Sequence, residues 1–242
     1  MNIPEILQPY ADFLQSTARP SNRIIFTLEQ TRPWESKLGG CPYLEDIGQY
    51  PMGEDGSPMM FLAQINLGEM PPLPDFPQEG LLQFYVENDD CYGLDSVCVV
   101  RYIPTYTTDE STLVRENPYC EDYEENLPFT KNCKISFERQ EVYIGTECPE
   151  FIEKFNGVSE KVNDALYDFC DASDSRVSGY PYFVQYAPAY YTSEKYVLLL
   201  QLDLDDTSGI MFGDSGNCTF LISREELLAK NFSNVEYDWQ CC

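Results

Sequence analysis

Residues 61–67 read FLAQINL, and residues 198–204 read LLLQLDL. Each run is apolar, has the length of a strand, and carries one glutamine at its fourth position. A short apolar run that is bounded by turn residues is typical of a strand buried on both faces. Because the two runs share this pattern 137 positions apart, they predict two copies of one structural unit.

The similarity continues on both sides of these two runs. Upstream, SKLGGCPYL at 36–44 matches SRVSGYPYF at 175–183, and downstream, GLLQFYV at 80–86 matches GNCTFLI at 216–222. The offsets between the copies are 139, 137 and 136 positions, so three segments recur in the same order with little drift. This recurrence predicts an internal duplication.

The duplication sets the expected fold class, which is α+β. Two copies of a unit too small to bury its own sheet should pack as two mostly antiparallel sheet halves about a pseudo-two-fold axis, with a few flanking helices. We expect a single domain over residues 1–242. Within it we expect an N-terminal helix in residues 1–20, a first repeat in 21–130 and a second repeat in 131–242.

Apolar side chains at helical spacing predict two helices outside the repeated strands. The first covers residues 2–16, where Pro9 should kink or split it. The second covers residues 149–172, where Gly157 should weaken it. A capping-box sequence that begins at Ser223 predicts a further short helix after the last matched strand.

The chain is strongly acidic and lacks histidine. Its 242 residues include 41 Asp and Glu, 15 Lys and Arg and no His, for a net charge of −26. Without histidine, Ser-His-Asp and Cys-His catalysis and His-ligated metals are excluded. Because binding to nucleic-acid phosphates or anionic membranes needs basic side chains, we expect neither partner. The acidity fits either solubility in a salty cytoplasm or a surface that captures a basic protein.

The ten cysteines do not predict a disulfide framework. No C-x-x-C spacing is present, and the first residues, MNIPEILQPYADF, contain no basic and apolar signal segment. No apolar run reaches the ~20 residues of a membrane helix. We therefore expect a cytoplasmic protein with reduced thiols, most of them small core residues or incidental surface groups.

Several of these segments resemble the YwqG-like family of bacterial proteins. In the first copy the similar segments are SKLGG-x-PYL at 36–44, DGSPMMFLAQINL at 55–67 and GLLQFY at 80–85; in the second they include FGDSGNCTFLI at 212–222 and YDWQC at 237–241. The resemblance covers about residues 20–242, and Tyr50 departs from it because the family usually has tryptophan there. It implies a soluble bacterial α+β protein with a duplicated unit, and it supplies no reaction.

Two glutamines are the most informative candidate site residues. Gln64 and Gln201 occupy the same place in their copies, and a buried amide there must be hydrogen-bonded. Asn66 and Asp203 follow two positions later on the same strand face. Either the two amides bridge backbone across the pseudo-axis, or the four side chains line a ligand-binding cleft between the copies. No catalytic residue, metal ion or cofactor is predicted.

A calcium loop is a weaker interpretation of Asp203, Asp205 and Asp206. Gly209 is one position too late for EF-hand spacing, and Asp214 stands where that loop has its glutamate. Solvated carboxylates in a turn fit this stretch better.

The sequence therefore leaves two functions open. The first is an acidic interaction module with a tyrosine-rich surface that includes Tyr190 and Tyr191, and that binds or inhibits a basic protein. The alternative is a small-ligand binder or an enzyme that uses a polar cleft between the two repeats.

Overall fold

One large antiparallel sheet dominates the fold. A computed structural model describes residues 3–242. Ten strands lie in the order β10-β9-β8-β7-β1-β6-β2-β3-β4-β5, and the neighbouring pairs are antiparallel. The strands are β1 (Arg19–Thr27), β2 (Lys37–Leu38), β3 (Met60–Asn66), β4 (Leu81–Val86), β5 (Cys98–Ile103), β6 (Cys133–Val142), β7 (Arg176–Val177), β8 (Tyr196–Leu202), β9 (Asn217–Ser223) and β10 (Glu236–Gln240).

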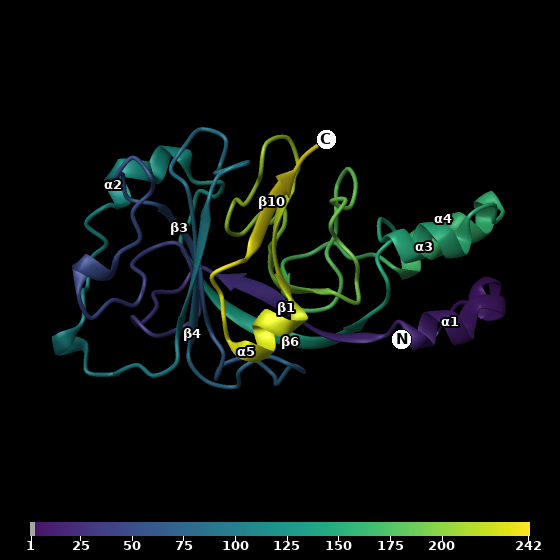
Figure 1. Cartoon of the computed structure of the whole chain (residues 1–242), viewed down its shortest axis with the longest axis horizontal. Coiled ribbons are helices and arrows are strands. Elements are labelled where there is room, and N and C mark those ends of the chain that lie inside the picture. Colours follow the sequence, from purple (N-terminus) through teal and green to yellow (C-terminus); the bar gives the residue numbers. More distant parts are fainter. Residues whose placement is uncertain (1–2) are drawn as a thin grey trace.

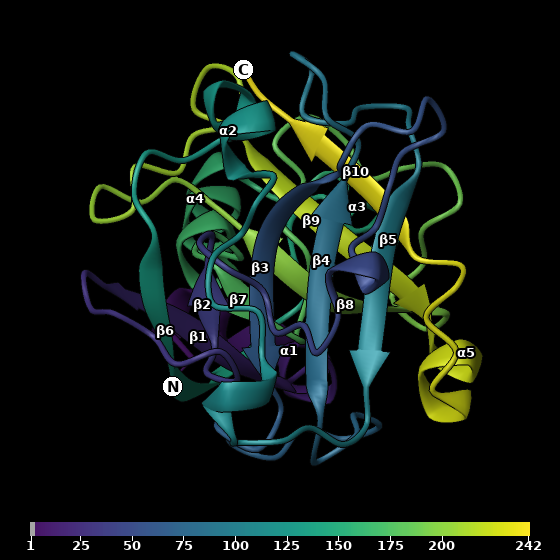
Figure 2. The ribbon, with the colours of Figure 1, turned by 90° about the vertical axis from the view of Figure 1, so that its left-hand side faces the viewer.

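The sheet curves until its two outer strands approach each other, so that it resembles a barrel with one open seam (Figure 1 and Figure 2). Side chains bridge this seam. The Cys98 thiol at the start of β5 lies 3.3 Å from the carbonyl oxygen of Val235, just before β10. Trp239 of β10 donates its indole N–H to the carbonyl oxygen of Cys91 over 2.7 Å. The barrel is thus nearly closed, although β5 and β10 are not paired.

Several strands are buried along almost their whole length. Every residue of β3, β4 and β8 is buried, as are the first six residues of β9. Inside the curved sheet, Phe84 of β4 and Phe220 of β9 lie with ring centroids 5.0 Å apart. The continuous apolar runs in the sequence reflect this burial on both faces.

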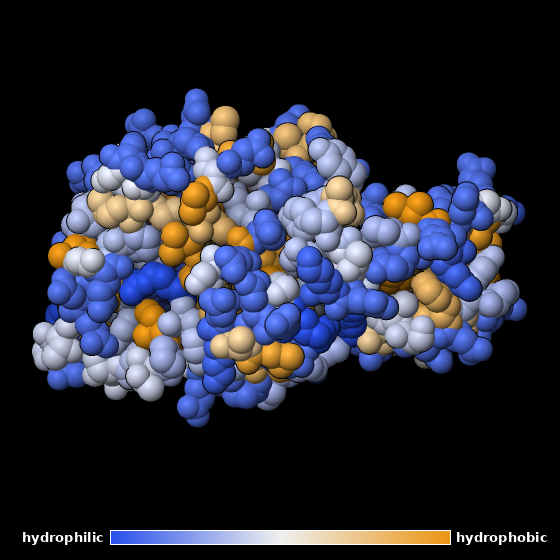
Figure 3. Space-filling view, viewed as in Figure 1, coloured by the Kyte–Doolittle hydropathy of each residue, from blue (hydrophilic) through white to orange (hydrophobic). Residues whose placement is uncertain are grey.

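The helices are short and lie outside the sheet. They are α1 (Ala11–Ser16), α2 (Cys120–Tyr123), α3 (Pro149–Phe155), α4 (Glu160–Phe169) and α5 (Arg224–Ala229), with 3-10 turns η1 (Glu5–Tyr10), η2 (Ile47–Gln49), η3 (Glu110–Thr112) and η4 (Glu124–Asn126). Helices α1, α3 and α4 form a lobe at one end of the molecule (Figure 1), where they cover the outer face of β8 and β9. Hydrophilic side chains occupy most of the face in Figure 3.

The predicted helices are present, but their own breaking residues divide them. Pro9 lies in η1, which precedes α1, and Gly157, with a φ of +81°, separates α3 from α4. Residue 2 of the predicted first helix lies outside the described residues. Since β1 already begins at Arg19, the helical segment is shorter than the predicted 1–20. The Ser223 hydroxyl caps α5 by accepting from the Glu226 amide over 3.3 Å.

The predicted α+β class, the mostly antiparallel sheet and the few flanking helices are confirmed. The two predicted sheet halves are joined in one continuous sheet, because β1 and β6 pair with each other along the whole length of β1. On their other sides, β1 pairs with β7, and β6 pairs with β2. Each of these two strands therefore adjoins the part of the sheet that comes from the other half of the chain.

Candidate functional site

Gln64 of β3 connects three backbone segments. Its side chain is fully buried. Its Oε1 accepts from the Tyr43 amide at 2.8 Å and from Gln83 Nε2 at 2.9 Å, and its Nε2 donates to the carbonyl oxygens of Pro33 and Glu35 at 2.8 and 2.9 Å. The amide therefore uses both donors and both acceptor positions. The expectation that it is buried and hydrogen-bonded is confirmed.

Gln201 of β8 makes the corresponding set of contacts in the second half. It is also fully buried. Its Oε1 accepts from the Tyr182 amide at 2.8 Å, and its Nε2 donates to the carbonyl oxygens of Ala172 and Asp174 at 2.9 and 2.8 Å. Both glutamines thus bridge backbone, but each bridge lies within its own half of the chain.

Asn66 and Asp203 extend these two networks. Asn66 Nδ2 donates to the carbonyl oxygen of Trp34 and to the Tyr106 hydroxyl, both at 2.9 Å. Asp203 accepts from the amides of Asp174 and Leu204 at 2.9 and 2.8 Å. Four strands lie between β3 and β8 in the sheet, so the first-half and second-half pairs do not meet. That these four residues bind a ligand stays a prediction.

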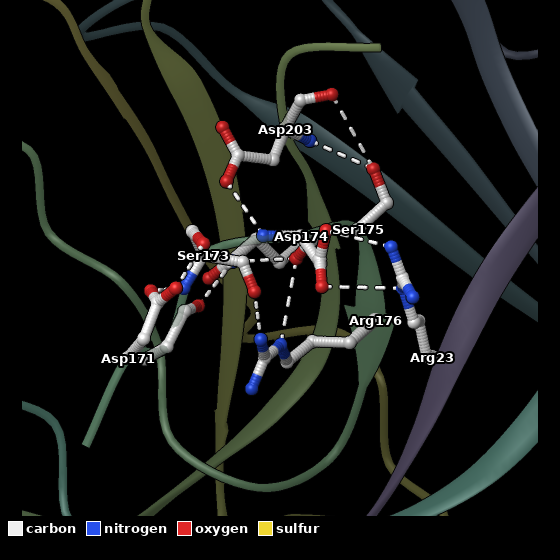
Figure 4. A network of polar contacts seen from close by, with 9 residues as sticks. Arg23, Asp171, Ser173, Asp174, Ser175, Arg176 and Asp203 are labelled. Carbon is white, nitrogen blue, oxygen red and sulfur yellow. Dashed lines mark hydrogen bonds and ion pairs between the residues drawn. The ribbon is translucent and has the colours of Figure 1, made fainter. Parts of the chain in front are cut away.

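The second-half network continues to a buried arginine that the sequence interpretation missed (Figure 4). Arg176 of β7 is only 2% exposed. Its guanidinium donates to the carbonyl oxygens of Ser173 and Asp174. Burial lowers its pKa, and the nearby carboxylates of Asp174, Asp171 and Asp203 oppose that shift. Arg176 is thus a cation held in an acidic part of the structure.

Lys37 of β2 is a second buried cation, and it pairs with Gln64 as Arg176 pairs with Gln201. Its ammonium donates to the carbonyl oxygens of Arg32, Pro33 and Cys41 at 2.8, 3.1 and 3.2 Å. Burial lowers its pKa to about 8. The signal that could have identified both cations is a basic residue after the serine in SKL and SRV.

Three hollows lie near these networks and the seam. The Lys37 pocket, of about 470 Å³, is lined by Lys37, Arg32 and Arg115 among others. The Gln201 pocket, of about 440 Å³, is bounded by backbone partners of Gln201. The seam groove, of about 480 Å³, follows the start of β5 and the strand β10.

The seam groove is acidic and rich in tyrosine. Tyr186 and Tyr190, which are 66% and 40% exposed, line it together with Asp95, Glu236 and Asp238. Burial raises the pKa of the Tyr190 phenol, and the carboxylates of Glu236 and Asp238 raise it further. The phenol therefore stays neutral at physiological pH and can only donate or accept hydrogen bonds there.

Residues 36–241 match the family model described as "Domain of unknown function (DUF1963)". The chain belongs to the DUF1963 family. The match begins at the SKLGG segment and ends within the closing YDWQC segment, so it includes both glutamine networks. No curated protein matches the chain. Within residues 3–242, no helix has the length and apolar character that a membrane span requires. The prediction of a family without a defined role is confirmed, and the YwqG-like name stays a prediction.

The aspartates of the suggested calcium loop serve the backbone of this DUF1963 domain. Asp205 Oδ1 accepts from the amide and the hydroxyl of Ser208, both at 2.7 Å. Both carboxylate oxygens of Asp203 accept backbone amides. Among the residues that the structure describes, no group of three Asp, Glu or Cys side chains is placed to hold a metal ion.

All ten cysteines are free thiols, and four of them, Cys133, Cys148, Cys170 and Cys218, are buried. Burial raises the pKa of Cys148 and Cys170 from 9.0 to about 12. Such thiols are poor nucleophiles at neutral pH, because the thiolate is the reactive form. Their role in this DUF1963 domain is that of small core residues.

These thiols predict how stability depends on pH. Above pH 9 the thiols ionise in the unfolded chain and stay protonated in the folded one, so each lowers the free energy of unfolding by about 1.4 kcal/mol per pH unit. Lys37 opposes this between pH 8 and 10.5, where the unfolded chain keeps a proton that the folded chain loses. Urea unfolding in reductant at pH 7, 9 and 10 measures the slope. Cys148→Ala should remove one thiol's share, and an unchanged slope in that variant would contradict the interpretation.

Proposed function

We propose that this DUF1963 domain is an acidic interaction module that binds a basic protein through the seam groove. The observation that carries the proposal is the lining of the groove. Three carboxylates, Asp95, Glu236 and Asp238, lie beside the exposed rings of Tyr186 and Tyr190, and no lysine or arginine of the described chain lines the groove. Tyrosine is enriched where proteins bind one another, because it offers a large ring and a polar hydroxyl.

The position of the groove supports binding of an extended segment. At the ends of the sheet, β5 pairs only with β4, and β10 pairs only with β9. Outer strands carry backbone donors and acceptors that a further strand can use. An added strand would gain affinity from main-chain hydrogen bonds and specificity from side chains in the groove. The seam is therefore suited to a partner that presents an extended stretch of chain.

The charge of the chain supports a basic partner. A net charge of −26 creates a field that attracts cationic molecules and accelerates their encounter. At the groove itself, lysine or arginine side chains of the partner would neutralise carboxylates that otherwise lie close together. We expect such binding to weaken as salt screens the exposed charges.

We expect a basic, strand-forming peptide of alternating lysine and valine to bind the full chain, and to bind less tightly at high salt. In fluorescence anisotropy, the double variant Asp95→Asn with Glu236→Gln should weaken binding about tenfold, equivalent to roughly 1.4 kcal/mol. Asparagine tolerates the positive φ of Asp95, which is +59°, so this variant should fold normally.

The matched control is Glu124→Gln with Glu125→Gln, which removes the same charge from the exposed η4 turn. It should change the affinity by less than about twofold, because its effect is only long-range. Equal weakening by both double variants would show that binding follows net charge and not the seam groove. Pull-downs from native lysate with the same variants would then extend the test to natural partners.

A small-ligand binder or enzyme is the second candidate function. It is supported by the Lys37 and Gln201 pockets, whose walls include backbone partners of Gln64 and of Gln201. Since the two networks lie on separate strands, a ligand would occupy a pocket within one half. A screen of small metabolites by thermal shift, in which nothing stabilises the protein, would count against this candidate.

We also infer that the chain is an internal duplication with a pseudo-two-fold axis between β1 and β6. Two matched bonds support this: the Ile24 amide donates to Ser175 O at 2.8 Å, and the Ile135 amide donates to Ser36 O at 3.0 Å. The bulges in β3 and β8 also lie 137 positions apart. An exchange of β1 and β6 between the copies would make them one domain. The YwqG-like resemblance favours a bacterial cytoplasm as the setting that we propose.

A further inference from the structure

The Gln201 pocket lies away from the seam, between helix α4 and the loops on either side of β7. Its walls come from four separate parts of the chain: residues 146–147, Tyr167 of α4, residues 171–173 and residues 182–184. A volume of about 440 Å³ falls within the range of pockets that hold small molecules.

The charge of this pocket is negative. Glu147 and Asp171 line it, and no lysine or arginine does. Neither carboxylate belongs to an ion pair formed within residues 3–242. The nearest cation, Arg176, is directed to the carbonyl oxygens behind the wall, and Arg23 pairs with Asp174 at 3.1 Å (Figure 4). A ligand in the pocket therefore meets two carboxylates that no local cation neutralises.

Two tyrosines complete the walls. Tyr167 is 49% exposed, and Tyr182 is partly buried. Burial raises the pKa of Tyr182, and the carboxylates of Asp203, Asp171 and Glu147 raise it further. Both phenols are thus neutral, and a cation over the face of a neutral aromatic ring is attracted by about 0.5–2 kcal/mol.

The pocket does not suit a metal ion. In the described part of the chain, no three carboxylates or thiols converge closely enough to coordinate one. Carboxylates that lie apart around a larger hollow, with aromatic rings between them, suit a cation that carries carbon atoms as well as charge. We propose that the Gln201 pocket binds a small organic cation, with an alkylammonium or alkylguanidinium group between Glu147 and Asp171 and its hydrocarbon part against Tyr167 and Tyr182.

Gln201 prepares this pocket without lining it. Its side chain joins the Ala172 carbonyl to the Tyr182 amide, and both of these residues belong to the walls. The Asp171 carboxylate accepts from the amide and the hydroxyl of Ser173 at 2.8 and 2.9 Å, so the loop fixes its direction. Walls that are already ordered reduce the entropy lost on binding. This is a positioning role for the glutamine that the sequence singled out.

The inference goes beyond the proposed binding of a basic protein, and it uses a different surface. The same cationic group could come from a free amine or from a lysine or arginine side chain of a protein. Both sources have the same charge and hydrocarbon chain, so the pocket recognises their shared chemistry.

The test is a titration of the full chain with butylguanidinium chloride, followed by amide chemical shifts of residues 171–173 and 182–184. We expect saturable binding with a dissociation constant on the order of 1 mM, and no saturation of these shifts by the neutral analogue butanol. Glu147→Gln with Asp171→Asn should weaken binding at least about tenfold. Tyr167→Leu should weaken it about fivefold, whereas Tyr167→Phe, which keeps the ring, should change it little.

Other arms separate the alternatives. Asparagine at 171 keeps the side-chain oxygen that the Ser173 groups contact, so the charge variant should stay folded. The groove variant Asp95→Asn with Glu236→Gln should bind butylguanidinium as the wild type does, even if the peptide test of the groove fails. Tighter binding of acetyl-arginine methylamide than of butylguanidinium would point to a protein side chain, and the reverse to a free amine. Equal saturation by butanol, or unchanged binding in the Glu147 and Asp171 double variant, would overturn the proposal.

Discussion

Gln201→Leu is expected to lower the free energy of unfolding by about 3–5 kcal/mol. Leucine has a similar size, but it cannot replace the three hydrogen bonds to Ala172, Asp174 and Tyr182. Three buried backbone groups would then lack a partner, and each costs roughly 1–3 kcal/mol when it is not satisfied. Urea unfolding followed by far-ultraviolet circular dichroism measures the change.

The chain offers one matched variant and one matched control for this substitution. Gln64→Leu should be at least as destabilising, because Gln64 makes four hydrogen bonds within its own half. Gln140→Leu should stay within about 0.5 kcal/mol of the wild type, since the buried Nε2 of Gln140 has no partner in the described structure. If all three variants lose the same stability, the loss comes from glutamine replacement in general, and the bracket role is wrong.

Phe220→Ala is expected to destabilise the protein by about 3–5 kcal/mol. The ring of Phe220 in β9 is fully buried and lies 5.0 Å, centroid to centroid, from Phe84 in β4. These strands belong to different halves of the chain and meet only because the sheet curves onto itself. Removing the ring would leave a cavity in the middle of the barrel-like core, and thermal unfolding measures the loss.

A double-mutant cycle shows whether the two rings interact directly. With Phe84→Ala as the second substitution, we expect a coupling of about 0.5–1.5 kcal/mol, as for other edge-to-face aromatic pairs. A control is Leu221→Ala, in the same strand but on the face that packs against the helical lobe. It should also destabilise the protein, yet show additive effects with Phe84→Ala. Additivity of the Phe84 and Phe220 variants would contradict the packing of β4 on β9.

Sequence reasoning located the polar networks because their signal is local. A glutamine inside an apolar run identifies a buried amide, and burial requires hydrogen bonds wherever the amide lies. The partners could not be predicted, since they are carbonyls and amides of loops such as residues 33–35 and 172–174. Those loops have no periodic pattern, and their positions depend on the strands that they connect.

The two buried cations were missed for a related reason. A lone Lys37 or Arg176 beside apolar residues looks like an exposed residue at the edge of a strand. Its burial depends on carbonyl groups that surround it only in the folded chain. The seam groove and the Gln201 pocket were also invisible, because their walls come from segments far apart in the sequence.

The sequence alone determined the local properties of this protein: its buried strands, its breaking residues, its acidity and its resemblance to a family of undefined role. Apolar runs and turn residues encode burial and chain reversal directly, since these depend on a few neighbouring side chains. Only the tertiary structure decided that β1 pairs with β6 and that one sheet curves until β5 approaches β10. Strand partners are chosen by the free energy of the whole sheet, and that sum includes contacts between residues more than 100 positions apart.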